Sequence, residues 1–178
     1  MKTFPRLSLL AALIATATFS SGAFAASVNG TASATALIPI SITAPTALNF
    51  GSFATTAAAN GGTITLTSGG TRAATGTGVV LSGGQAGAVA GVFTITGSGS
   101  AGFAVTYPAG ATTLAGPTPG VTAVFGTTAG AGATYGLGSG NLSGGSFTLN
   151  VGGILTIPAT AVAVGTYSST YPVIVEYN

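Results

Sequence analysis

The chain has 178 residues, of which 3 are Lys or Arg and 1 is Asp or Glu, and it contains no His and no Cys. Nucleic-acid binding requires clustered basic side chains against phosphates, so this composition excludes a nucleic-acid partner. Acid–base catalysis, thiol chemistry and most metal sites require His, Cys, Lys or paired carboxylates. We therefore expect no enzyme activity, no catalytic residue, no cofactor and no bound metal.

Residues 1–25 have the features of a secretory signal peptide. Lys2 and Arg6 give the charged start, and an apolar stretch of about a dozen residues leads to Ala-Phe-Ala at 23–25, a cleavage pattern. The stretch is too short to span a bilayer as a helix. We therefore expect export, cleavage before Ala26, transit through the periplasm and a mature chain without a transmembrane span.

Cleavage at this point would leave Arg72 and Glu176 as the charged side chains of the mature protein. We expect these two side chains to be exposed or paired with each other. Net charge normally keeps protein molecules apart in solution, and lysine normally protects sheet edges from pairing. A neutral mature chain without lysine is therefore expected to function in an assembly.

Residues 26–36 alternate between small apolar side chains at even positions and small polar ones at odd positions. This is the period of a strand with one dry face and one wet face. The dry face consists of Ala26, Val28, Gly30, Ala32, Ala34 and Ala36. One interpretation is an ordinary strand of the same domain, paired with the last strand. The other, which we favour because a complete first strand at 37–43 follows, is a donor strand that completes the sheet of the next subunit.

The rest of the chain predicts one all-β domain over 37–178. Apolar and β-branched residues alternate with polar ones between glycine-rich turns, which is typical of many short strands. The predicted strands are 27–43, 47–53, 62–67, 77–82, 91–96, 102–107, 121–126, 133–137, 146–151, 154–157 and 165–177. Many short strands in a domain of this length favour an antiparallel β-sandwich, which we expect to have about nine strands.

Large apolar residues and glycine pairs add two further expectations. Glycine pairs, 152–153 among them, are expected to take positive φ in hairpin turns and bulges. The core is expected at Leu48, Phe50, Leu66, Phe93, Ile95, Phe103, Phe125, Phe147, Leu149 and Leu155.

Several segments resemble a secreted bacterial family known as a domain of unknown function. These segments are ALNFG at 47–51, GGTITL at 61–66, VGGILT at 151–156 and GTYSSTYPVIVEYN at 165–178. The resemblance covers almost the whole of the predicted mature chain.

The two ends also resemble the pilin subunits of chaperone–usher fimbriae. In those subunits the last strand carries a glycine near its start, alternating apolar residues and a penultimate tyrosine. The resemblance implies an incomplete immunoglobulin-like fold, with strands 37–43 and 165–177 beside an acceptor groove for a chaperone or a neighbour's extension. The acceptor or chaperone-facing residues would be Gly165, Tyr171, Val173, Val175 and Tyr177. The disulfide of many pilins has no counterpart here, because the chain has no cysteine.

We therefore expect a structural subunit of a bacterial pilus or fimbria, a homopolymer formed by strand exchange that ends as an extracellular, cell-surface fibre in cell adhesion. The partners implied by the resemblance are a periplasmic chaperone and an outer-membrane usher. The alternative is a monomeric secreted β-sandwich adhesin or other binding module. Against it stands the lack of polar or aromatic clusters that would form a binding site.

Overall fold

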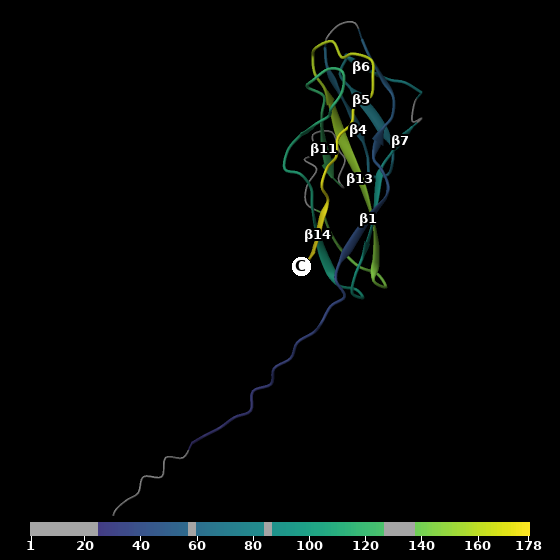
Figure 1. Cartoon of the computed structure of the whole chain (residues 1–178). Coiled ribbons are helices and arrows are strands. Elements are labelled where there is room, and N and C mark those ends of the chain that lie inside the picture. Colours follow the sequence, from purple (N-terminus) through teal and green to yellow (C-terminus); the bar gives the residue numbers. More distant parts are fainter. Residues whose placement is uncertain (1–24, 57–59, 84–86, 127–137) are drawn as a thin grey trace, which may run out of the picture. The chain divides into compact units, whose positions relative to one another are not determined.

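A computed structural model of the chain describes residues 25–56, 60–83, 87–126 and 138–178 (Figure 1). The chain divides into two compact units, Met1–Thr35 and Ala36–Asn178. Residues 1–24 of the predicted signal peptide and the predicted strand 133–137 lie outside the described residues.

The described part of the second unit is built from strands and contains no helix, so the predicted all-β class is confirmed. The first seven strands are β1 (Ser41–Thr46), β2 (Asn49–Phe50), β3 (Phe53–Thr55), β4 (Gly62–Leu66), β5 (Arg72–Thr75), β6 (Val79–Leu81) and β7 (Ala88–Val89). The other seven are β8 (Gly91–Thr96), β9 (Gly102–Thr106), β10 (Thr112–Thr113), β11 (Thr122–Gly126), β12 (Gly138–Asn141), β13 (Ser146–Ile157) and β14 (Ile174–Tyr177).

The long strand β13 organises the largest sheet, which has seven strands (Figure 1). Its first half pairs antiparallel with β8, which in turn pairs with β1. Its second half pairs with β11 on one edge and β4 on the other. Strands β10 and β5 extend these two branches, and the sheet is curled as a half-barrel.

Three smaller antiparallel sheets complete the described domain. Strands β12, β9 and β14 form a three-stranded sheet in that order, while β2 pairs with β7 and β3 pairs with β6. Among the described residues, β1 is therefore an edge strand of the largest sheet and β14 an edge strand of the three-stranded sheet. The first and last strands of the domain each leave one edge open to further pairing.

Both terminal strands are shorter than predicted. The strand predicted over 27–43 begins only at Ser41, because Pro39 has no backbone N–H for a sheet ladder and the residues before Leu37 offer only small side chains for burial. The strand predicted over 165–177 forms only at Ile174–Tyr177. Pro172 explains this late start, since proline is confined to strand edges and ends.

Gly152 and Gly153 lie inside β13, so the predicted break between strands 146–151 and 154–157 is wrong. Neither glycine has a positive φ. An added Cβ on Gly152 would overlap the carbonyl oxygen of Leu66, and one on Gly153 would lie 2.8 Å from the carbonyl oxygen of Val124. Glycine is required at both positions because the backbones of β4 and β11 lie very close to β13 here, on its two opposite edges.

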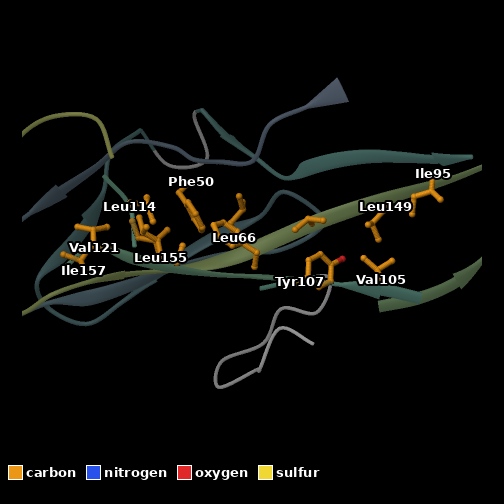
Figure 2. Packing of buried hydrophobic residues seen from close by; sticks show 14 of the residues in the cluster. Phe50, Leu66, Ile95, Val105, Tyr107, Leu114, Val121, Leu149, Leu155 and Ile157 are labelled. Atoms are coloured by element: carbon orange, nitrogen blue, oxygen red, sulfur yellow. The ribbon is translucent and has the colours of Figure 1, made fainter. Parts of the chain in front are cut away.

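The predicted core is confirmed. Seven of the ten predicted residues are buried in one cluster, and Leu48, Phe93 and Phe147 are partly buried against it. Figure 2 shows side chains of the whole buried cluster in a row, from Ile157 and Val121 at one end to Ile95 and Val105 at the other. Because so many residues of the chain are glycine or alanine, few large side chains are available to fill the interior, and those few are buried together.

Candidate functional site: an apolar groove and an unpaired extension

The N-terminal extension, residues 26–36, has no regular structure. Each of its residues is exposed, and Val28 retains 94% of its accessible surface. Strand β1 pairs with β8 and β14 pairs with β9, so pairing between the first and last strands is not found among the described residues. The alternating dry face of the extension therefore meets no partner strand in the described part of the chain.

A groove of about 780 Å³ lies in the second unit. Its first wall is residues 48–55, which follow β1, and its second wall is residues 162–169, which precede β14. Leu114, Phe125 and Leu155 contribute buried side chains to its floor. None of the described residues that line the groove is charged. The lining combines apolar side chains with Asn, Ser and Thr, so its chemistry suits an uncharged segment.

Tyr171 forms the aromatic part of this floor. Its ring stacks on Phe125, with centroids 3.9 Å apart and the planes at 11°. Phe93 packs edge-on against the same ring at 6.2 Å. Burial raises the pKa of Tyr171 from 10.0 to about 12, because the ionised phenolate is poorly solvated there. Tyr171 therefore stays neutral at physiological pH.

Arg72 holds the first wall in place. Its guanidinium donates from Nη1 to the carbonyl oxygens of Phe50, at 2.8 Å, and Ser52, at 3.0 Å, and from Nη2 to that of Ser82, at 2.6 Å. Only 3% of the residue is exposed, so the prediction of an exposed charge is wrong. The planar guanidinium can donate several bonds in fixed directions, and here it joins the short strands β2 and β3 at the bend around Gly51.

The second wall is fixed by hydrogen bonds to the segment that follows β10 and by one within itself. Ser168 and Ala115 exchange two backbone hydrogen bonds, at 2.8 and 2.9 Å. The hydroxyl of Tyr167 donates to the carbonyl of Ala163 at 2.8 Å. These bonds hold residues 163–168 in place beside the groove.

Tyr177 joins the two terminal strands at the far end from the groove walls. Its hydroxyl accepts from the N–H of Ser98 at 2.7 Å and donates to the carbonyl of Ile38 at 2.6 Å. The β1–β8 ladder ends at Ser41 opposite Thr96, and Pro39 cannot donate the next bond. The tyrosine hydroxyl thus bridges a donor and an acceptor just beyond the last rung of the ladder.

We expect Tyr177→Phe to lower the free energy of unfolding by about 1–2 kcal/mol, because two hydrogen bonds are lost while the ring is kept. Urea unfolding measures this change, and amide hydrogen exchange should be faster at Ser98 in the variant. Tyr167→Phe is the matched control, since it removes one exposed hydrogen bond and should cost less than half as much. An unchanged exchange rate at Ser98 would contradict the bridging role.

The predicted acceptor residues are divided between two places. Gly165 and Tyr171 line the groove. Val173 and Val175 pack against the core, and Val175 pairs with Val105 in the three-stranded sheet. Tyr177 also packs against the core and bridges Ile38 to Ser98, as described above. The predicted strand 165–177 thus supplies the second wall with its first half and an edge strand with its second half.

The sequence did not predict the first wall or its anchor. Residues 47–53 were expected to form one strand, but the chain bends at Gly51, whose φ is 73°, and forms the separate strands β2 and β3. Arg72 is the single basic residue that follows the predicted signal peptide, and this was the available signal, because a lone cation among apolar residues suggests a specific role.

The described residues include no group of three or more His, Cys, Asp or Glu side chains that could hold a metal ion. No helix among them is long and apolar enough to cross a membrane.

A family model described as a domain of unknown function, DUF4402, matches residues 40–177. The chain belongs to the DUF4402 family. Curated proteins and solved structures gave no match.

The DUF4402 region contains both groove walls and Tyr177, whereas Ile38 and the extension lie N-terminal to it. The resemblance to a domain of unknown function is thereby confirmed. The DUF4402 description carries no activity, so the function has to be argued from the groove and the extension.

Proposed function

We propose that this protein is a non-enzymatic structural subunit of a bacterial surface fibre of the pilus or fimbria type. In this proposal the 26–36 extension of one subunit enters the groove of the next and completes its sheet. The observation that carries the proposal is the exposed extension with an alternating dry face, together with an uncharged groove between two chain segments of the DUF4402 domain. In this proposal each molecule supplies one segment that becomes a strand on binding and one groove that receives such a segment.

The open edges of β1 and β14 support an incomplete immunoglobulin-like sandwich as the architecture. These strands belong to different sheets and are each paired on one edge among the described residues. An added strand would gain main-chain hydrogen bonds from such an edge, and alternate side chains would fix its register. The proposed fold is therefore completed by a partner.

Export through the predicted signal peptide, transit through the periplasm and display on the cell surface are parts of the same proposal. A periplasmic chaperone that covers the groove, and an outer-membrane usher that exchanges it for a neighbour, would be the assembly partners. A subunit with an unfilled apolar groove requires such cover, because exposed apolar surface and open sheet edges promote aggregation.

A pair of aspartate substitutions tests the proposal. Ala34→Asp places a carboxylate on the dry face of the extension, and burial of an unpaired charge in an apolar groove is strongly unfavourable. Thr35→Asp places the same charge on the wet face one residue away. Electron microscopy of cells that export each variant should show no fibres for Ala34→Asp and normal fibres for Thr35→Asp.

Two results would contradict strand exchange. One is equal assembly of the Ala34→Asp and Thr35→Asp chains. The other is fibre formation by a chain that lacks residues 26–36. The size of the groove, about 780 Å³, also falls within the range of small-molecule sites. A stable, folded monomer that lacks 26–36 would favour the second candidate, a secreted adhesin or binding module.

A further inference from the structure

The extension and the groove floor differ in the size of their side chains. The dry face of the extension carries nothing larger than Val28, and most of its positions are alanine or glycine. The groove floor, by contrast, carries large side chains, Leu114 and Leu155 beside the ring of Tyr171 stacked on Phe125. Larger donor side chains would bury more apolar surface if the groove had room for them, with a gain of about 0.8 kcal/mol for each methylene. Because the side chains of the floor already occupy the bottom of the groove, a donor with small side chains suits it.

We propose that Tyr171 determines which strands the groove accepts, and that it selects the small-residue extension of a second copy of this chain. This inference rests on the proposed strand exchange and adds the residue that gives it specificity. A floor that cannot move excludes large donor side chains, because closely packed interiors do not absorb added volume without strain.

Three contacts prevent the Tyr171 ring from moving away. Phe125 lies against one face at 3.9 Å, and Phe93 packs edge-on at 6.2 Å. The hydroxyl lies close to the backbone of β8, where a Cβ added to Gly91 would be 2.8 Å from the hydroxyl oxygen. With a larger residue at position 91 the ring would have to move, so glycine at this position keeps Tyr171 in the floor.

Charge also favours a second copy as the occupant. The described lining of the groove has no charged side chain, and neither has the extension. An uncharged strand with small side chains meets all these requirements.

The test first introduces larger side chains into the extension and then removes the Tyr171 ring from the groove. In the full chain, Gly30→Leu, Ala32→Leu and Ala34→Leu are expected to reduce the rate of fibre assembly at least tenfold, whereas Thr31→Leu on the wet face should leave it unchanged. Addition of Tyr171→Ala should restore assembly for the one dry-face variant whose leucine lies over the tyrosine. The other two should stay impaired, because their leucines face other parts of the groove.

Tyr171→Leu provides a second acceptor variant that keeps an apolar side chain if Tyr171→Ala does not fold, as judged by circular dichroism. Wild-type assembly rates for all three leucine variants, with Tyr171 intact, would overturn the inference. So would the failure of both acceptor variants to rescue any of the three. Failure of the wild-type chain itself to assemble is a different result, which overturns the proposed function and the inference with it.

Discussion

Replacement of Arg72 by alanine is expected to lower the free energy of unfolding by about 3–5 kcal/mol. Arg72 is 3% exposed, and its guanidinium donates to the carbonyls of Phe50, Ser52 and Ser82. Alanine would leave these carbonyl oxygens without their present donor, and it would also leave a cavity. Hydrogen bonds to charged groups contribute about 1.5–3 kcal/mol each, but bonds within one network are not additive.

Urea-induced unfolding followed by circular dichroism measures this loss. Arg72→Lys keeps the charge, but a single ammonium group cannot reproduce the fork of donors, so its loss should be intermediate. Glu176→Gln is the control, since Glu176 is exposed and substitutions at such sites usually change stability by less than about 0.5 kcal/mol. A loss below about 1 kcal/mol for Arg72→Ala would show that Arg72 does not hold the first wall.

The second large effect is expected at the centre of β13. Gly152→Ala should lower the free energy of unfolding by about 3 kcal/mol, at the upper end of the usual cost of overpacking. The added methyl would overlap the carbonyl oxygen of Leu66 and lie 2.8 Å from the backbone nitrogen of Ser68. Both atoms belong to the backbone, one in the last residue of β4 and the other two residues beyond it, so neither can move aside as a flexible side chain can.

Gly69→Ala is the matched control for this glycine. Its added methyl would lie 3.7 Å from the nearest atom, the Thr67 Oγ1, which is an ordinary contact. Thermal unfolding should therefore show a small change for Gly69→Ala and a decrease of several degrees for Gly152→Ala. Similar midpoints for the two variants would mean that β4 does not approach β13 as closely as the structure shows.

The fold class and the core could be predicted because both depend on local pattern. Alternation over short segments favours strands, and a chain with few large apolar residues has to bury most of them. Phe50, Ile95 and Phe103 were predicted on this ground and are buried. The strands predicted at 91–96 and 102–107 are found as β8 and β9, with one residue less at the end of β9.

The features that could not be predicted depend on contacts between distant segments. Gly152 and Gly153 have the sequence of a turn, and only the approach of β4 and β11 makes them part of a strand. The role of Arg72 depends on carbonyls 10 to 22 residues away in the sequence. The groove depends on the bend at Gly51, which divides the first wall into the short strands β2 and β3, and on the late start of β14, which leaves residues 162–169 outside the strands.

The alternation in residues 26–36 was visible in the sequence, but it did not distinguish a donor strand from an ordinary strand. The structure adds that this segment is exposed and forms no strand. The groove adds an uncharged site of suitable chemistry in the DUF4402 domain. Together these observations support strand exchange, and the proposal now depends on whether the extension of one molecule occupies the groove of another.

Cysteine cross-linking tests this most directly, because the chain contains no cysteine of its own. Two full-length chains, one with Ala32→Cys on the extension and the other with Ser169→Cys on the second wall, would be mixed during assembly and oxidised mildly. Strand exchange predicts a disulfide-linked pair of the two different chains, in much higher yield than with Ser143→Cys, an exposed control position in the turn before β13. Equal yields at Ser169 and Ser143, or fibres without the mixed pair, would contradict the account.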